Sequence, residues 1–319
     1  MKYRIGVDIG GTKISGAIIE NEKYIVEKAT LKTNLPKTIV EIEKDIEKLI
    51  EYILKESNIK IDEVKSVGMG FPGIVDFSKQ TIKNSCNFGW ENVKIPNFLG
   101  KKLGKSVFIE NDANAAVIGE YVYNDLHNVK NMILITLGTG IGAGIILNGQ
   151  LYRGFNFSAG EVGHMIIKKG GRQCSCGNRG CFEKYASKAG IVHSAFKVID
   201  KNEDSLLYRY LKEKGSLTVK MIFKAAKQGD KGALQAINLF IEDLSIGVSN
   251  IINIFQPEIF VIGGGISLGG DFFIDRLKEL VKELDYAKNL DKRCDIMISK
   301  IGNDAGLIGA ANIDKFTYI

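Results

Sequence analysis

The sequence predicts an α/β protein built from two similar halves, and three observations support this. Strand-like apolar runs alternate with segments in which apolar residues recur every three or four positions, as in α/β proteins. A strand, a glycine turn and a second strand open both halves, at residues 3–19 and again at 132–147. The length of 319 residues also favours two domains. We therefore expect a duplicated α/β unit.

The first half begins as a three-stranded meander and continues with a helix. Residues 3–9, 14–19 and 24–31 are rich in β-branched residues and are separated by turn residues, which predicts three strands. From residue 38 to 56, Ile and Leu recur at helical spacing with Glu and Lys between them, which predicts an amphipathic helix. The remaining elements of this half are strands at 64–70 and 107–109 and a helix that starts at Asp112, with an acidic first turn.

The second half repeats the opening pattern and then becomes more helical. Strands are expected at 132–137 and 143–147, and the later elements are strands at 259–262 and 296–299 and helices at 218–227, 233–254, 272–284 and 305–313. We place the boundary at about residue 118. Residues 1–118 then form an N-terminal α/β domain, on which the helix at about 304–319 packs back, and residues 119–303 form a C-terminal α/β domain.

Composition and charge argue against several classes of protein. Charged residues make up 25% of the chain, and the net charge of +6 is spread without a dense basic block, so a nucleic-acid partner is not expected. The N-terminal apolar run contains Asp8 and two glycines, unlike a signal peptide. Four glycines interrupt residues 132–147, the longest apolar region, unlike a membrane helix. We expect a cytoplasmic protein without a membrane partner.

A cluster of potential zinc ligands lies in the C-terminal half. His164, Cys174, Cys176 and Cys181 form the pattern H-x9-C-x-C-x4-C, and Glu161 and Glu183 flank it. Structural zinc takes four ligands, commonly three thiolates and one imidazole, and cysteines of a reducing compartment favour metal over disulfide. Three unrelated buried cysteines near a histidine are the alternative. Against it, three of the five cysteines fall within eight residues among glycines, a composition typical of loops.

Three glycine turns follow predicted strands. Asp8 precedes the first turn, Gly10-Gly11-Thr12-Lys13, and Gly138-Thr139-Gly140 forms the second. Glycine lets backbone N–H groups approach a phosphate closely, so one such turn in each half predicts a polyphosphate site, although a single turn alone would favour an ordinary hairpin. Gly264 and Gly265 belong to the third turn, which leaves room for a flat ligand such as adenine.

A polar segment, Glu110-Asn111-Asp112-Ala113-Asn114, joins a predicted strand to a helix. Ligands of α/β proteins usually bind at such strand ends, whereas helix capping would explain only one of Asn111 and Asp112. Asp112 can accept the proton of an attacking hydroxyl group. Because its ordinary pKa of about 3.9 lies far below that of an alcohol, the transfer would be late, as expected for phosphoryl transfer.

These motifs together resemble the ROK family (repressors, open reading frames, kinases), and most of all its bacterial glucokinases. The resemblance extends over nearly the whole chain. It includes both phosphate turns, the Glu110–Asn114 segment and the combination of Gly160-Glu161, Gly163-His164 and the three cysteines. It implies an actin-like (RNase H-like) sugar kinase fold of two domains with a central ligand cleft.

The resemblance also implies residue roles. Asp112 would be the catalytic base for the 6-hydroxyl of a sugar, and His164 would bind a structural Zn²⁺ and the sugar through different ring nitrogens. Asp8 would help to hold Mg²⁺-ATP. The other implied sugar ligands are Asn87, Asn111, Glu161 and Glu183, and the other implied nucleotide ligands are Gly10, Gly11, Thr12, Lys13, Gly138, Thr139, Gly140, Gly264 and Gly265. An aromatic core loop is the alternative reading for Phe88 and Trp90, which follow Asn87.

Several functions stay open at this stage. We expect ATP-dependent phosphorylation of glucose to glucose 6-phosphate, with N-acetylmannosamine or fructose as alternative substrates, because hexoses share most hydroxyl positions. A sugar-binding regulator without catalysis is an alternative of another class. DNA-binding repressors of this family carry an added N-terminal domain, for which the residues before Asp8 leave no room. A homo-oligomer, a dimer or a tetramer, is expected.

Overall fold

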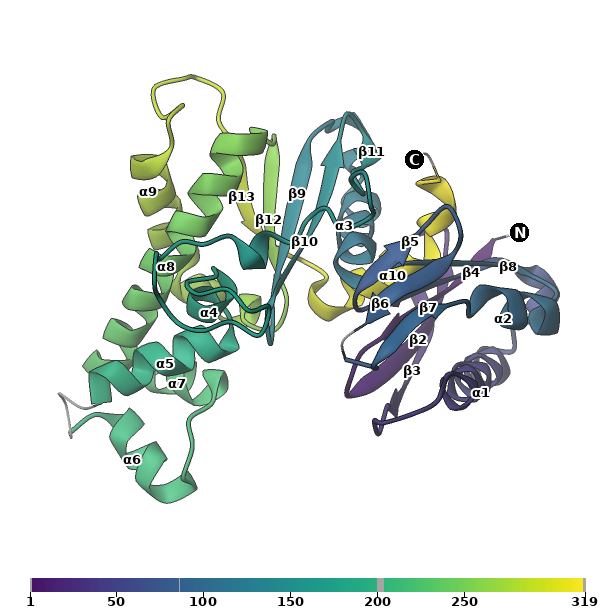
Figure 1. Ribbon diagram of the computed structural model, residues 1–319, viewed down its shortest axis with the longest axis horizontal. Helices are drawn as coiled ribbons and strands as arrows, with labels where there is room; N and C mark the ends of the chain where they lie inside the picture. Colours follow the sequence, from purple (N-terminus) through teal and green to yellow (C-terminus); the bar gives the residue numbers. More distant parts are fainter. Residues whose placement is uncertain (1, 86, 200–203, 318–319) are drawn as a thin grey trace. The chain divides into compact units, whose positions relative to one another are not determined.

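The computed structural model describes residues 2–85, 87–199 and 204–317, and it consists of two compact units (Figure 1). Unit 1 comprises Met1–Leu134, Gly144–Gly160 and Asn303–Ile319, and unit 2 comprises Ile135–Ala143 and Glu161–Gly302. Unit 1 thus runs past residue 118, at which we placed the boundary, and includes the C-terminal segment. Strands β9 (Met132–Leu137) and β10 (Ile141–Leu147) each begin in one unit and end in the other.

Unit 1 is organised around a five-stranded sheet with the order β3-β2-β1-β4-β8. The first three strands are antiparallel, and β4 and β8 run parallel to β1. The parallel strands end together, so the residues that follow them lie at one edge of the sheet. The bounds are β1 Tyr3–Ile9, β2 Lys13–Glu20, β3 Tyr24–Lys32, β4 Val64–Phe71 and β8 Ser106–Asn111.

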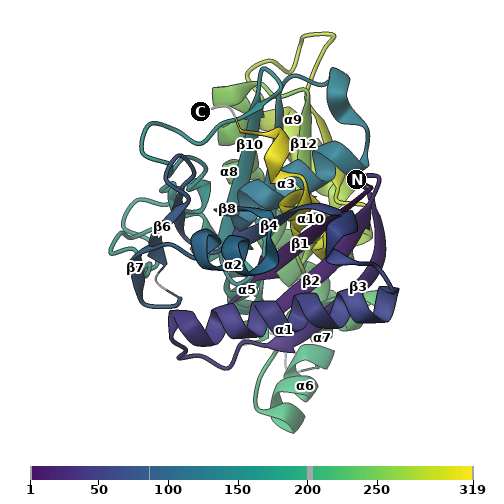
Figure 2. The same ribbon diagram turned by 90° about the vertical axis from the view of Figure 1, so that its right-hand side faces the viewer.

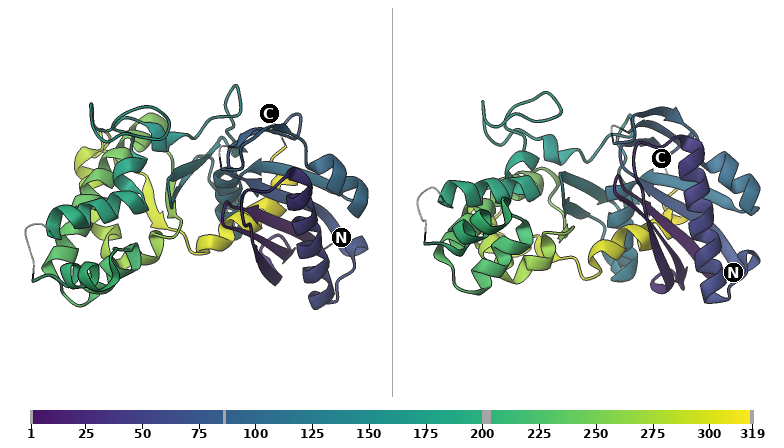
Figure 3. Two further views of the ribbon diagram at one scale, coloured as in Figure 1. Left: turned by 60° about the horizontal axis from the view of Figure 1, so that its bottom comes forward. Right: turned by 90° about the horizontal axis from the view of Figure 1, so that it is seen from below.

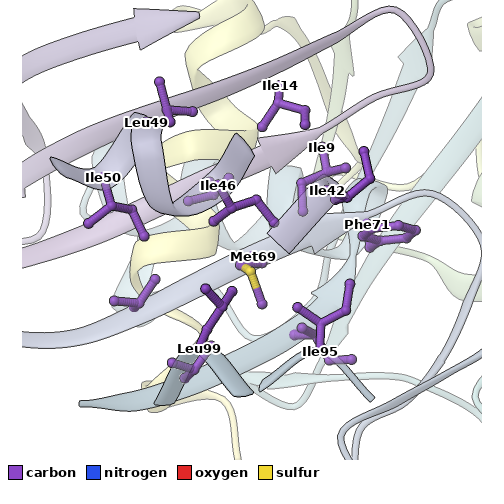
Figure 4. Close-up of a cluster of buried hydrophobic side chains, with 14 of the residues drawn as sticks. Ile9, Ile14, Ile42, Ile46, Leu49, Ile50, Met69, Phe71, Ile95 and Leu99 are labelled. Atoms are coloured by element: carbon purple, nitrogen blue, oxygen red, sulfur yellow. The ribbon is translucent and has the colours of Figure 1, made fainter. Parts of the chain in front are cut away.

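Helix α1, Ile39–Ser57, packs beside β2 and β3 and closes the core of unit 1 (Figure 2). Thr38 caps it, and Glu41 completes a capping box. The helix buries one apolar stripe against the sheet, as its periodicity predicts. Figure 4 shows this core, in which the following side chains are all buried: Ile9, Ile14, Ile42, Ile46, Leu49, Ile50, Met69, Phe71, Ile95 and Leu99.

The C-terminal helix α10, Ala305–Ala311, packs on the opposite face of the same sheet, next to α3, Asp112–Tyr123. A Cβ atom on Gly6 would lie 1.9 Å from the carbonyl oxygen of Leu307, whereas one on Gly16 would meet Leu49 of α1. Side chains alternate along a strand, and Gly6 is paired with Ala17, beside Gly16, so the two helices cover different faces. Only a residue without a side chain allows α10 to lie this close.

Smaller elements complete unit 1. A three-stranded sheet has the order β5-β6-β7, and short 3₁₀ turns occur at Ile61–Glu63, Leu126–Asn128 and Ile313–Lys315. The sequence analysis did not predict this second sheet or α2. The bounds are β5 Ile74–Asp76, β6 Thr81–Ser85, β7 Trp90–Val93 and α2 Pro96–Leu103.

The second large sheet has the order β11-β10-β9-β12-β13, which repeats the strand order of the first. Its first three members again follow one another as a meander, and β12 and β13 are parallel. The predicted duplication is therefore confirmed, and the architecture is actin-like. The bounds are β9 Met132–Leu137, β10 Ile141–Leu147, β11 Gln150–Leu151, β12 Ile259–Gly263 and β13 Asp295–Ile298.

Helices of unit 2 gather in a layer, teal to green in Figure 3, around α8. Helix α8, Lys231–Phe255, is long and apolar enough to cross a membrane, but most of it is buried among α5, α7 and α9, as in a core helix. The other helices are α4 Glu183–Ala186, α5 Lys188–Ile199, α6 Leu206–Lys214, α7 Val219–Lys227 and α9 Ile274–Leu284, with 3₁₀ turns at Val162–His164 and Ser267–Phe272. The 3₁₀ turn Gly302–Asp304 leads from unit 2 back into unit 1.

Candidate active site and metal centre

Two carboxylates meet at the end of the parallel strands of unit 1. Asp8 of β1 is paired with Gly70 of β4, and Gly70 is paired with Glu110 of β8, two residues before Asp112. A Cβ on Gly70 would lie 3.6 Å from the Cα of Asp112 and 3.9 Å from Oδ1 of Asp8. The sheet register thus brings together two residues that the sequence separates by about a hundred positions.

The surroundings of these carboxylates favour their protonated forms. Burial and the charge of Asp112 raise the pKa of Asp8 to about 6, and Lys13 opposes this increase. Asp112 reaches solvent, but protein atoms displace much of the water around its carboxylate, and this desolvation raises its pKa. The backbone N–H groups of Ala113 and Asp112 and the side chain of Asn111 act in the opposite direction. Shifted carboxylate pKa values are frequent at functional sites.

Asn111 caps helix α3. Its Oδ1 accepts hydrogen bonds from the backbone N–H groups of Ala113 (2.9 Å) and Asn114 (3.1 Å), and its Nδ2 donates to the carbonyl oxygen of Gly73 (3.0 Å). The side chain of Asn111 also hydrogen-bonds the carboxylate of Asp112, which lowers the pKa of that carboxylate. The cap also fixes the first turn of the helix, which carries Asp112.

The first glycine turn is braced by a buried threonine. The N–H of Gly10 donates to the carbonyl oxygen of Lys13 (2.9 Å), and Thr33 donates its hydroxyl to the carbonyl oxygen of Gly10 (2.6 Å). Thr33 also donates its N–H to the carbonyl oxygen of Thr12 (3.0 Å). The side chains of Thr12 and Lys13 remain exposed. The turn is therefore a fixed backbone segment with two polar side chains beside Asp8.

In unit 2, the second and third glycine turns lie side by side. Gly264 has φ +82°, and a Cβ there would lie 2.6 Å from the backbone of Leu137, which immediately precedes Gly138. Lys188, which the sequence analysis did not single out, donates its backbone N–H to the carbonyl oxygen of Gly138 (3.0 Å). Its Nζ lies 3.8 Å from where a Cβ on Gly265 would be. Only the fold, and no local sequence signal, places this cation beside both turns.

The four predicted metal ligands come together. All their ligand atoms lie within 4.8 Å of one another, with Cys174 Sγ 3.7 Å from His164 Nδ1 and Cys176 Sγ 3.6 Å from Cys181 Sγ. Zinc–ligand bonds of about 2.0 to 2.3 Å at tetrahedral angles require ligand separations of roughly 3.5 to 3.8 Å. Burial raises the pKa of Cys181, so bound zinc would supply the charge that favours its thiolate. The donor set and its spacing fit zinc.

Two glutamates adjoin the cysteine cluster. His164 turns Nε2 toward Oε2 of Glu161, at 3.9 Å, while Nδ1 faces Cys174. Oε1 of Glu183 accepts a hydrogen bond from Cys174 Sγ at 3.2 Å. A Cβ on Gly140 would lie 2.6 Å from the other oxygen of Glu183. Glu183 therefore lies between the cluster and the second glycine turn, and a side chain at position 140 would displace its carboxylate.

Asn87 differs from the two aromatic residues that follow it. Its side chain is exposed in the turn between β6 and β7, whereas Phe88 and Trp90 are each only 8% exposed and pack on Phe71. The three ring centroids lie 4.9 to 5.6 Å apart. Phe88 and Trp90 are thus core residues, the alternative that we left open, and Asn87 alone is available to a ligand.

The candidate residues fall into two groups. Unit 1 holds Asp8, the first glycine turn, Asn87, Asn111 and Asp112, and unit 2 holds both other glycine turns, the cysteine cluster and the two flanking glutamates. The sequence analysis missed a buried ion pair in unit 1 between Glu110 and Arg153, whose Oε2 and Nε lie 2.8 Å apart. A charged residue in a loop gives no sequence signal of burial.

This chain is similar over nearly its whole length to known proteins. The model of the ROK family matches residues 4–315. A glucokinase of Thermotoga maritima is 36% identical over 98% of this chain and 96% of its own length. A solved ROK family glucokinase of Streptomyces griseus, in complex with glucose and AMPPNP, has a TM-score of 0.84 and 31% identity over 98% of both chains. A xylose repressor of Bacillus spizizenii is 32% identical over 98% of this chain but over 76% of its own length.

Proposed function

This chain belongs to the ROK family, and on that premise we propose that it transfers the γ-phosphoryl group of ATP to the 6-hydroxyl of glucose, forming glucose 6-phosphate. The coarser assignment, an ATP-dependent sugar kinase, rests on the family and on its glucokinase members. The observation that carries the proposal is the pair of carboxylates, Asp8 and Asp112, at one edge of the sheet of unit 1.

Asp112 is proposed as the catalytic base. Its carboxylate is exposed at the start of α3, where it accepts the backbone N–H of Ala113 at 2.9 Å, and Asn111 caps the same helical turn. It would accept the proton of the sugar hydroxyl late in the transfer, a role that contributes about 10²- to 10⁴-fold to the rate. Burial raises its pKa, which brings this general base closer to the pH range in which proton transfer is efficient.

Asp8 and the glycine turns are proposed to bind the nucleotide. Mg²⁺ bound with ATP would neutralise charge on the phosphates, and Asp8 offers the oxygen ligand that this ion prefers. The backbones of Gly10, Gly11, Thr12, Gly138, Thr139 and Gly140 would face the phosphates, with Lys13 nearby. Gly264 and Gly265 would leave room for adenine. Lys188 adds a positive charge next to Gly138 and Gly265.

The sugar hydroxyls are proposed to contact six side chains, those of Asn87, Asn111, Asp112, Glu161, His164 and Glu183. A hydroxyl both donates and accepts, so this mixture of carboxylates, an amide and an imidazole suits a hexose. We further propose that His164, Cys174, Cys176 and Cys181 hold a structural zinc ion, which fixes the ring of His164 and leaves Nε2 for the sugar. A homo-oligomer and a cytoplasmic location stay predictions.

A regulator without catalysis is the second candidate, and the xylose repressors among the relatives favour it. The repressor named above is longer than the stretch that it shares with this chain. A regulator would bind sugar without turnover. N-acetylmannosamine kinase and fructokinase activities are alternatives within the first candidate, because contacts to a few hydroxyls separate hexoses weakly.

The test is ADP release from Mg²⁺-ATP with glucose, mannose, fructose, N-acetylglucosamine or N-acetylmannosamine. We expect the highest kcat/KM with glucose, and we expect Asp112→Asn to reduce kcat by at least about 10²-fold. Asp125→Asn, which removes an exposed carboxylate paired with Lys23, is the matched control. Preference for another sugar would change the substrate but not the mechanism, whereas sugar binding without turnover would favour the regulator.

A further inference from the structure

A buried ion pair lies directly behind Asp112. The side chains of Glu110 and Arg153 are 1% and 4% exposed, and Nε of Arg153 donates to Oε2 of Glu110 at 2.8 Å. Burying two charges is unfavourable unless they are paired and further hydrogen-bonded. Glu110 belongs to the same Glu110–Asn114 segment as Asp112, so the pair connects Arg153 to this segment.

The second oxygen of Glu110 holds the beginning of helix α3. Oε1 accepts the backbone N–H of Asn111 at 2.9 Å and Nδ2 of Asn114 at 3.0 Å. These donors precede and follow Asp112 in the sequence. Glu110 therefore fixes the helical turn from both sides of the proposed base, while Arg153 holds the carboxylate in the required orientation.

Arg153 also connects this turn to two other segments of unit 1. It donates a hydrogen bond from a terminal guanidinium nitrogen to the carbonyl oxygen of Phe316 at 2.6 Å, and its guanidinium carbon lies 4.0 Å from the centroid of the Phe77 ring. A planar guanidinium can make these three contacts at once, whereas an ammonium group cannot. Residues outside the Glu110–Asn114 segment therefore hold the guanidinium of Arg153 beside Glu110.

We propose that Arg153 is a positioning residue for the phosphoryl transfer, acting on Asp112 through Glu110. It does not touch the reacting atoms. Its contribution is to keep the Asp112 carboxylate where the sugar hydroxyl can reach it, and misplacement by about 1 Å can reduce a rate on the order of 10²-fold. This inference rests on the proposed kinase activity and deepens it.

The test compares kcat, KM and folding in four variants. We expect Arg153→Met to lower kcat by about 30- to 100-fold, with KM for ATP changed less than about threefold, because the nucleotide turns are intact. Arg153→Lys should recover part of kcat. The double variant Arg153→Met/Glu110→Gln should be more active than Arg153→Met alone, because the glutamine still accepts from Asn111 and no unpaired charge remains buried.

Arg4→Met is the matched control. Arg4 is also buried and pairs with Glu22 and Asp314 at 3.3 Å, but it lies at the opposite end of β1 from Asp8. Both single arginine variants should lose stability, yet only Arg153→Met should lose kcat. Amide hydrogen exchange in residues 111–114 should accelerate in Arg153→Met and remain unchanged in Arg4→Met.

The outcomes separate two kinds of failure. A folded parent protein that phosphorylates no sugar would overturn the proposed function. An active parent with unchanged kcat in folded Arg153→Met would overturn this inference alone, and so would an equal loss of kcat in Arg4→Met. If Arg153→Met does not fold, kcat and the amide hydrogen exchange of residues 111–114 are measured in Arg153→Lys instead. Values equal to those of the parent protein would then overturn the inference.

Discussion

The carboxylate of Asp8 is proposed to help bind Mg²⁺-ATP, but in its ionised form it destabilises the folded protein. Its pKa rises from an ordinary value of 3.8 to about 6, so the folded protein holds this proton more tightly than the unfolded chain does. Between these two pH values the native state binds more protons, and stability therefore falls as the pH rises. At neutral pH the ionised carboxylate destabilises the fold by about 3 kcal/mol at most.

We predict that Asp8→Asn is more stable than the parent at pH 7.5, by up to about 3 kcal/mol. The difference should shrink as the pH falls through 6 and be small near pH 4, where both side chains are neutral. Urea unfolding across this pH range measures it. Mg²⁺-ATP should stabilise the parent much more than the variant, because only the parent offers the carboxylate of Asp8 to the ion.

A stability difference that does not change with pH would contradict this account of Asp8. Glu41→Gln is a suitable control. Thr38 lowers the pKa of Glu41 through two hydrogen bonds, so its carboxylate is favourable when ionised and its contribution has the opposite dependence on pH. The two variants should therefore diverge as the pH rises.

At the level of elements, the sequence predicted well wherever a pattern is long or repeated. The strands at 3–9 and 132–137 and the long helices α1 and α8 appear within a few residues of their predicted bounds. The small sheet β5-β6-β7 was missed because its strands are only three to five residues long, too short for a clear period. Element α10 ends at Ala311, two residues early, where Asn312 follows in a non-helical conformation.

The candidate site also has features that the sequence predicted and features that it did not. Glycine turns, the cysteine spacing and the Glu110–Asn114 segment are local patterns and could be read directly. Contacts made across the fold could not, because they join residues far apart in the sequence. Arg153, 43 residues from Glu110, and Lys188, 50 residues from Gly138, are the two examples. Neither position differs in local sequence from an ordinary exposed cation.

Helix α5 yields a further prediction, because its first residue is Lys188. We expect Lys188→Met to weaken ATP and ADP binding by about three- to tenfold, the usual range for one partly exposed charged contact to a phosphate. Adenosine, which has no phosphate, should bind both proteins equally. Isothermal titration with the three ligands measures this, and Lys184→Met, a change of the neighbouring lysine on α4, is the control. Equal weakening of adenosine binding would place Lys188 elsewhere than at the phosphates.

At the level of the whole molecule, the two large sheets share a strand order but carry different functional residues. The end of the first sheet carries the two carboxylates, Asp8 and Asp112. In the second, the equivalent turn lies beside Lys188 and Glu183, and the cysteine cluster lies between β11 and α4 in the chain. We therefore expect a change in one unit to alter the stability and the ligand contacts of that unit, and to leave the stability of the other unit unchanged.

Zinc removal tests this separation. The loop from Glu161 to Phe182 is held by short backbone contacts, such as Cys174 N–H to Asn178 O at 2.9 Å, and contains little apolar core, so the metal is expected to supply much of its stability. We predict that chelation, or Cys176→Ser, lowers the melting temperature and weakens sugar binding, because His164 loses its fixed orientation. Hydrogen exchange should increase in residues 161–187 and stay unchanged in β1 and β4.

Cys294→Ser is the matched control, since Cys294 lies outside the cluster and should have little effect on metal content. Metal content measured by mass spectrometry under native conditions should be one zinc per chain in the parent and in Cys294→Ser, and less in Cys176→Ser. Unchanged melting and unchanged sugar affinity in fully zinc-free protein would show that the four residues do not support the sugar site. A uniform increase of amide hydrogen exchange through both units would instead mean that the metal stabilises the whole molecule, against the separation inferred from the two units.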